Sequence, residues 1–150
     1  MKKSNLLENP KRVVVDTNVI ISGILSPRGF PSKIINDWLH LKFIGLLSNP
    51  LILEITDVLS RPKIIKLAGV KSIHFNNIIK TLKEKSEIII PNDTLEVCKD
   101  PKDNMLFELA EKGNADFIIT GDKLVLEVEQ YKKTKIVTPT WFAANILINL

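Results

Sequence analysis

The stretch of sequence that decides the fold is Val13-Val14-Val15-Asp16, three β-branched residues followed by an acid. An apolar run without alternation is typical of a strand buried on both faces, as in a parallel sheet covered by helices. Other short, mostly apolar stretches share this character. We expect further strands at residues 43–47, 87–90, 117–120 and 135–137.

Helical patterns lie between these strands, and several open with Ser, Asp or Pro, which cap or begin helices. The predicted helices cover residues 32–41, 50–60, 72–85, 101–112 and 140–150. Residues 26–31 (SPRGFP) follow a first helix-like stretch and contain three strong turn formers, so they predict a loop. Alternating strands and helices predict an α/β fold, a three-layer α/β/α sandwich with a central, mainly parallel sheet.

Length and composition predict one domain. A chain of 150 residues with 45% hydrophobic residues can bury its own core. We expect that domain at residues 12–150, after a short polar leader at residues 1–11 that need not be ordered. The single cysteine, Cys98, cannot form an internal disulfide, which fits a reducing compartment. Neither a signal-peptide core nor an 18-residue apolar run is present, so we expect a cytoplasmic protein outside the membrane.

Acidic residues are informative when they are sorted by the edge of the sheet at which they fall. Ligands of open α/β sheets bind beyond the carboxyl ends of the parallel strands. Asp16 directly follows the first strand, and Asp122 follows residues 117–120 with one glycine between. Asp116 precedes its strand and falls at the opposite edge. Taken alone, Asp16 could instead cap the helix that follows it.

Two further acidic segments lie on predicted helices. On spacing alone, Glu54 is an ordinary solvated helix carboxylate, and Asp57, three residues on, could replace or assist it. Asp100 has the position of an N-cap before Pro101, and Asp103 falls in the first helical turn, where an anion is favourable. If Asp100 caps the helix, Asp103 is free to point into a site, so we assign a metal to Asp103 and a supporting role to Asp100.

The order of these motifs resembles the PIN domain, and most closely its VapC-type branch, the toxins of toxin–antitoxin systems. The resemblance is carried by residues 13–25 (VVVDTNVIISGIL), Glu54, 100–104 (DPKDN), 115–122 (ADFIITGD), 59–63 (LSRPK) and 137–142 (VTPTWF). One departure is visible, because relatives often continue the last acidic motif as GDKDLL, whereas residues 121–126 read GDKLVL. Asp122 is kept, but the second acid of that motif is absent.

The resemblance implies a metal-dependent endoribonuclease. Its catalytic and metal-binding residues would be Asp16, Glu54, Asp103 and Asp122, supported by Thr17, Asn18 and Thr120. The ion would be Mg²⁺ or Mn²⁺, which suits carboxylate ligands that leave positions for water and phosphate, and no His or Cys cluster competes for zinc. A bound ion lowers the pKa of water, so hydrolysis would leave 5′-phosphate and 3′-hydroxyl ends. Toxins of this kind usually act as homodimers restrained by an antitoxin protein.

The charge balance is compatible with RNA as the partner. When the four assigned acids are set aside, 13 acidic residues remain against 21 basic ones, which is enough to guide a phosphate backbone. The candidate contacts with that backbone are Arg12, Arg28, Lys99, Lys102 and Lys123. For each of them, a solvated surface position is the alternative.

Three other mechanisms or functions make different demands on the sequence. A metal-free ribonuclease needs paired histidines, and His40 and His74 have no recognisable partner. Dehalogenase-like phosphatases, which form an aspartyl phosphate, need a second Asp where this chain has Asn18. The remaining rival is a catalytically inactive PIN module that binds RNA or a protein partner.

Overall fold

The central sheet has six strands in the order β3-β2-β1-β4-β6-β5, and all pairs are parallel except the antiparallel β5–β6 pair. The strands are β1 (Arg12–Val15), β2 (Ile44–Leu47), β3 (Glu87–Ile88), β4 (Phe117–Ile119), β5 (Gln130–Tyr131) and β6 (Thr134–Val137). These elements come from a computed structural model that describes residues 9–68, 72–91 and 95–150. The predicted α/β class is therefore confirmed. Most of the predicted leader, residues 1–8, lies outside the described residues.

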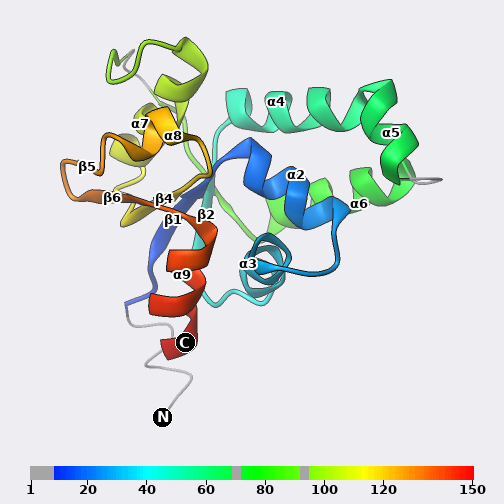
Figure 1. Ribbon diagram of the computed structural model, residues 1–150, viewed down its shortest axis with the longest axis horizontal. Coiled ribbons are helices and arrows are strands. Elements are labelled where there is room, and N and C mark those ends of the chain that lie inside the picture. Colours follow the sequence, from blue (N-terminus) through cyan, green and yellow to red (C-terminus); the bar gives the residue numbers. More distant parts are fainter. Residues whose placement is uncertain (1–8, 69–71, 92–94) are drawn as a thin grey trace.

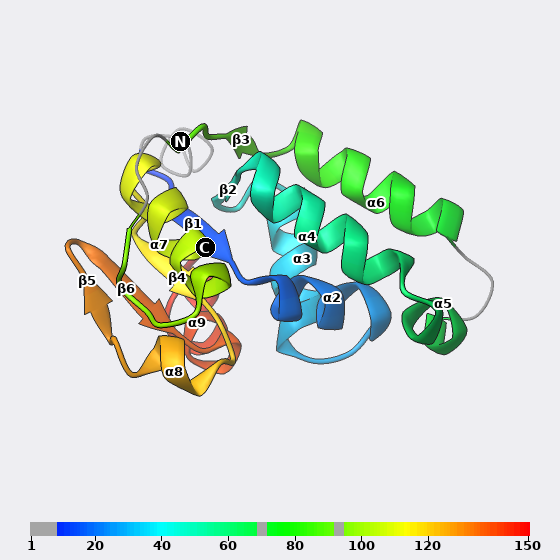
Figure 2. The same ribbon diagram turned by 90° about the horizontal axis from the view of Figure 1, so that it is seen from above.

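Helices surround the sheet (Figures 1 and 2). They are α2 (Thr17–Leu25), α3 (Phe30–Leu39), α4 (Asn49–Ser60), α5 (Pro62–Ala68), α6 (Ser72–Glu84), α7 (Pro101–Lys112), α8 (Lys123–Leu126), α9 (Pro139–Asn145) and the 3-10 turn η1 (Leu147–Asn149). Figure 2 shows α4 and α6 side by side, extending away from the strands toward α5. None of the helices described here is long and apolar enough for a membrane span.

The two faces of the sheet can be distinguished at β2, where successive side chains point to opposite sides. A Cβ built on Gly45 would lie 2.0 Å from Nε1 of Trp38, so this position faces α3 and leaves no room for any side chain. Leu46 points the other way, toward Gly113 at the end of α7. The sheet is thus covered by α3 on one face and by α7 on the other, as the sandwich prediction requires.

The first strand lies in the middle of the sheet, between β2 and β4, which explains its composition. Val13, Val14 and Val15 are completely buried. Aromatic residues continue the core beneath α9, where the ring of Phe142 packs edge-on against Phe43 at 5.6 Å and against Phe117 at 5.5 Å. The apolar run of β1 therefore fits a strand that is covered on both faces.

Element boundaries differ from the sequence prediction in a few places. The predicted loop at residues 26–31 is shorter, because α3 begins at Phe30 with Pro31 in its first turn, a position that needs no backbone N–H. Strand β3 has only two residues, both exposed, since it pairs on one side with β2 alone. The C-terminal helix ends at Asn145 and gives way to a 3-10 turn. The short elements α5, α8 and β5 were not predicted.

Candidate active site

A cleft of about 240 Å³ lies where the carboxyl ends of β1 and β4 meet the starts of α2 and α7. It is lined by Asp16, Thr17, Asn18, Glu54, Val58, Arg61, Asp100, Lys102, Asp103 and Asp122. All four acids that the resemblance assigns to the metal share this cleft, together with three of the four supporting residues. Their segments are distant in sequence, and the parallel sheet brings them to one edge.

Asp16 leaves β1 and enters α2, and its backbone N–H donates to the carbonyl of Ile119 in β4 at 2.9 Å. Its side chain makes no helix-capping hydrogen bond, so the alternative of a simple capping aspartate is wrong. Instead, one carboxylate oxygen accepts from Oγ1 of Thr120 at 2.7 Å. Burial raises the pKa of Asp16 and the charge of Glu54 adds to this, while the Thr120 hydrogen bond opposes the shift.

Thr120 joins two of the acids, although it does not itself line the cleft. Its hydroxyl donates to Asp16 and accepts from the backbone N–H of Asp122 at 3.0 Å. It is completely buried, so its orientation is set by the surrounding core. Asp122 in turn caps α8, because its Oδ1 accepts from the N–H of Leu124 at 2.9 Å. Thr120 thus hydrogen-bonds to Asp16 and Asp122 from behind the cleft, in the supporting position that the resemblance implies.

Helix α4 contributes Glu54, and Arg61 follows seven residues later at the C-cap of that helix. Two helical turns separate these positions, which places them on the same face. Glu54 accepts a hydrogen bond from Oγ1 of Thr17 at 2.6 Å. Arg61 pairs with the exposed Asp57 at 3.1 Å and also lines the cleft. Asp57 does not line it, so it cannot replace Glu54 as a ligand in this conformation.

At the start of α7, Asp100 and Asp103 have the two different positions that the sequence predicts. Asp100 caps the helix by accepting from the N–H of Lys102 at 2.9 Å. Asp103 lies in the first turn and faces the cleft, where burial and the charges of Asp122 and Asp100 raise its pKa from 3.8 to about 6. A carboxyl group with such a pKa is not fully ionised near neutral pH unless a cation stabilises it.

Sequence reasoning missed the role of Asn104. This side chain is 6% exposed and fastens the segment that precedes α7. Its Oδ1 accepts from the N–H groups of Val97 and Cys98 at 2.8 and 2.6 Å, and its Nδ2 donates to the carbonyl of Cys98 at 2.8 Å. The residue stands in the DPKDN motif, which was the signal available. Arg61 was missed too, although its spacing from Glu54 marks the same helix face.

The predicted basic contacts are spread around the molecule. Lys102 lines the acidic cleft, Lys99 lines a neighbouring hollow, and Lys123 follows Asp122 on the exposed side of α8. Arg28 follows α2, so it stands one nine-residue helix, about 13 Å, from the cleft. Of the five predicted bases, Lys102 is thus the one that lines the acidic cleft.

Arg12 lies at the other edge of the sheet. It pairs with Glu87 at 2.8 Å and donates to the carbonyl of Gly113 at 2.7 Å, and its backbone N–H donates to Asp116. This placement removes the support for Arg12 as a contact of RNA bound at the acids, because the guanidinium is engaged at the amino end of β1. The expected position of Asp116 at this opposite edge agrees with the structure.

The chemistry of the cleft fits a hard divalent cation. Among the described residues that line it, five are carboxylates and two, Arg61 and Lys102, are cations, and every acidic ligand offers oxygen. In the conformation described, however, no three Asp, Glu, His or Cys side chains within residues 9–68, 72–91 and 95–150 converge closely enough to hold one ion. One carboxylate oxygen of Glu54 accepts from Thr17, and one of Asp122 accepts from the first turn of α8, so each of these side chains has a hydrogen-bond partner in this conformation.

Comparison with known proteins agrees with the fold and with the order of the motifs. The family model of the PIN domain matches residues 12–124. A Methanocaldococcus jannaschii protein, named "Uncharacterized protein MJ1680", is 35% identical over 125 residues, or 81% of this chain and 77% of that protein. The crystal structure of PAE2754 from Pyrobaculum aerophilum has the same fold, with a TM-score of 0.61 at 14% identity over 93% of this chain and 90% of that one. The chain belongs to the PIN-domain family, whose members are generally nucleases.

Proposed function

We propose that this protein is a divalent-metal-dependent endoribonuclease. The observation that carries the proposal is the meeting of Asp16, Glu54, Asp103 and Asp122 in one cleft, with the pKa of Asp103 raised to about 6. Carboxylates placed so that they cannot all ionise freely are typical of sites that are completed by a cation. We expect Mg²⁺ or Mn²⁺, and the four acids would hold the ion.

The bound ion would supply a water of lowered pKa and neutralise charge on the phosphodiester. The remaining work falls to the protein. Thr120 fixes the carboxylate of Asp16, and Thr17 fixes that of Glu54. Arg61 and Lys102 are the cations of the cleft, and we expect them to bind the phosphates beside the scissile bond. Their charges offset the repulsion that five acids would exert on a polyanion.

The test compares the wild-type protein with Asp103→Asn and with Glu84→Gln on end-labelled single-stranded RNA in Mg²⁺, in Mn²⁺ and in EDTA. Glu84 on α6 is a suitable control, because it is an exposed acid that lies outside the cleft and belongs to none of the ion pairs among the described residues, whereas Asp57 pairs with Arg61 of the cleft. We expect the wild type and the control to cleave RNA to 5′-phosphate products in a metal-dependent way. In Asp103→Asn the cleavage rate should fall by roughly 100-fold or more. Equal cleavage by all three proteins would exclude Asp103 from the site.

An inactive PIN module remains the second candidate, and one observation favours it. Within the described residues, the acids do not converge as metal ligands without a change of side-chain conformation. If the inactive module is correct, RNA binding will persist in every metal tested and no products will form. Isothermal titration of Mg²⁺ into the protein separates the two, since a module without metal affinity gives no saturable heat.

The resemblance to the toxin branch supports a more specific role. We propose that the protein acts in the cytoplasm as the toxin of a toxin–antitoxin pair, as a homodimer restrained by an antitoxin protein. Size-exclusion chromatography at micromolar concentration tests the dimer. A single monomeric peak would contradict dimerisation while leaving the nuclease proposal intact.

A further inference from the structure

A second hollow of about 350 Å³ adjoins the acidic cleft on the side of α8. It is lined by Val97, Cys98, Lys99, Asp100, Asp103, Leu124, Glu127 and Val128. Asp100 and Asp103 belong to both spaces. The two differ in chemistry, because the cleft presents mainly polar atoms and the hollow presents mainly apolar ones.

The walls of this hollow belong to segments that adjoin two of the acids, Asp103 and Asp122. On one side, Asn104 fastens the backbone of Val97 and Cys98 and stands next to Asp103. On the other side, α8 starts at its cap Asp122 and is anchored by the completely buried Val125. The hollow therefore has a defined position relative to two of the proposed metal ligands.

An exposed apolar side chain, that of Leu124, completes the lining of the hollow. Leu124 is 64% exposed at the start of α8, beside the hollow, although Val125 next to it is buried. A hollow with an apolar wall and charged groups at Lys99 and Glu127 suits a flat ring that carries hydrogen-bonding edges. Its volume lies near the lower end of the range of about 300–1,000 Å³ for small-molecule pockets.

We propose that this hollow is a subsite for one nucleobase of the RNA strand whose phosphate occupies the acidic cleft. The inference rests on the proposed function and names how its substrate is recognised. A single RNA strand alternates charged phosphates with bases whose faces are apolar, so a polar cleft beside an apolar hollow matches two successive parts of the strand. Apolar side chains commonly enclose a base that has left its stack.

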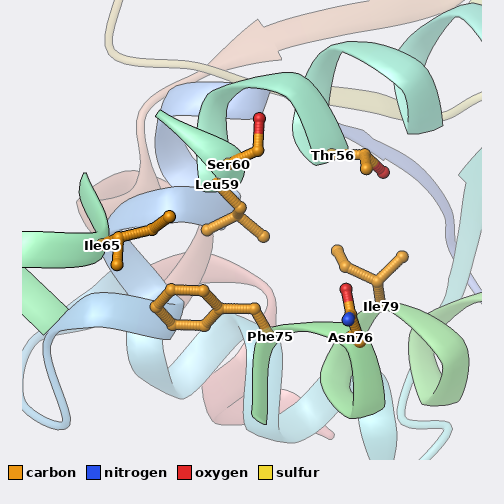
Figure 3. A pocket seen from close by; sticks show the side chains of 7 residues that line it. All are labelled: Thr56, Leu59, Ser60, Ile65, Phe75, Asn76 and Ile79. Atoms are coloured by element: carbon orange, nitrogen blue, oxygen red, sulfur yellow. The ribbon is translucent and has the colours of Figure 1, made fainter. Parts of the chain in front are cut away.

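A further hollow among the described residues does not compete for this role. It lies between α4, α5 and α6 and is lined by Thr56, Leu59, Ser60, Ile65, Phe75, Asn76 and Ile79 (Figure 3). None of these residues lines the acidic cleft. A base bound there would share no lining residue with the acidic cleft. The hollow beside α8, in contrast, shares Asp100 and Asp103 with that cleft.

The single cysteine provides a direct measurement of occupancy, because Cys98 lines the hollow and is the only thiol in the chain. We would measure the rate of its alkylation by iodoacetamide in Mg²⁺ with each of the four nucleoside 5′-monophosphates or with ribose 5-phosphate. For a dissociation constant near 1 mM, about 10 mM nucleotide should slow alkylation about tenfold. Ribose 5-phosphate should leave the rate nearly unchanged, because it lacks the base.

Two variants localise the effect. Leu124→Ser removes the apolar wall and should abolish the protection, whereas Leu67→Ser changes a leucine of similar exposure on α5, 69% against 64%, and should keep it. Equal protection by ribose 5-phosphate and by all nucleotides, or none by any nucleotide, would overturn the proposal. The measurement needs no cleavage, so it fails or succeeds independently of the nuclease test.

Discussion

Replacing Asp103 by Asn should stabilise the metal-free protein. Asp103 has a pKa of about 6 in place of its ordinary 3.8, chiefly through burial and secondarily through the charges of Asp122 and Asp100. At 1.36 kcal/mol for each pH unit, this rise corresponds to about 3 kcal/mol of destabilisation of the folded state when Asp103 is ionised. The side chain is partly exposed, so solvent screening reduces the figure to about 2 kcal/mol.

One effect of the Asp103→Asn substitution opposes this gain in stability. A carboxylate in the first turn of α7 is favoured by the helix dipole, which contributes roughly 0.3–1 kcal/mol that asparagine loses. The expected net stabilisation of Asp103→Asn is therefore about 1–2 kcal/mol, or a rise of roughly 2–8 °C in Tm for a chain of this length. Most active-site substitutions that remove a structural contact would lower the Tm instead.

The direction in which stability changes with pH follows from the number of protons that Asp103 binds in the folded and in the unfolded state. Between pH 3.8 and about 6 the folded state binds more protons at Asp103 than the unfolded state does, so wild-type stability falls as the pH rises through this window. The destabilisation is absent below the window and complete above it. The difference between Asp103→Asn and the wild type should thus be largest at about pH 8, should be much smaller at about pH 4, and should vanish only below pH 3.8.

The assay is thermal or urea unfolding of both proteins in EDTA across that pH range, followed by addition of Mg²⁺. At about 100 times its dissociation constant, the ion should stabilise the wild type by about 2.7 kcal/mol and the variant by less. The reasoning is refuted if the variant is no more stable than the wild type in EDTA at about pH 8, or if a difference persists unchanged to about pH 4. Glu84→Gln, which changes an exposed acid outside the cleft, should show neither effect.

Three further substitutions test residues that hold the site and the sheet in place. Asn104→Ala removes three hydrogen bonds and should lower the free energy of unfolding by about 2–4 kcal/mol in urea; a loss under about 1 kcal/mol would contradict this. Thr120→Val leaves Asp16 without its donor and should weaken Mg²⁺ binding about tenfold in a thermal-shift titration, and unchanged affinity would refute it. Gly45→Ala places a methyl group against Trp38 and should cost about 3 kcal/mol in the same unfolding assay; a neutral result would show that the ring can move.

Much of the fold could be predicted because its strongest signals are local. The three valines of β1 require two covered faces, and α7 was predicted at its observed limits because Asp100 and Pro101 mark its start. The short elements α8 and β5 escaped prediction, since four and two residues are too few to show a period. The start of α3 was placed late because Pro31 was interpreted as part of a turn rather than of a first helical turn.

The candidate site could be predicted in outline but not in detail. Sorting acids by strand ends identified Asp16 and Asp122, because the topology of a parallel sheet fixes that edge. Glu54 needed the resemblance, since a carboxylate in a helix looks the same wherever the helix lies. The second hollow could not be predicted, because Val97 and Leu124 meet only when the segment before α7 and α8 are packed together.

Burial and the neighbouring charges raise the pKa of Asp103, and a comparison with the other four acids of the cleft shows that no hydrogen bond among the described residues opposes this rise. Asp16 accepts from a buried hydroxyl, Glu54 accepts from another hydroxyl, and Asp100 and Asp122 accept from backbone N–H groups. Among the residues described in the structure, Asp103 is the one acid of the cleft whose carboxylate accepts no hydrogen bond. Each of the other four acids is partly stabilised by its own donor, while Asp103 carries the repulsion without one. A cation that entered the cleft would therefore relieve Asp103 most, and removal of its charge should both stabilise the empty protein and weaken the bound ion.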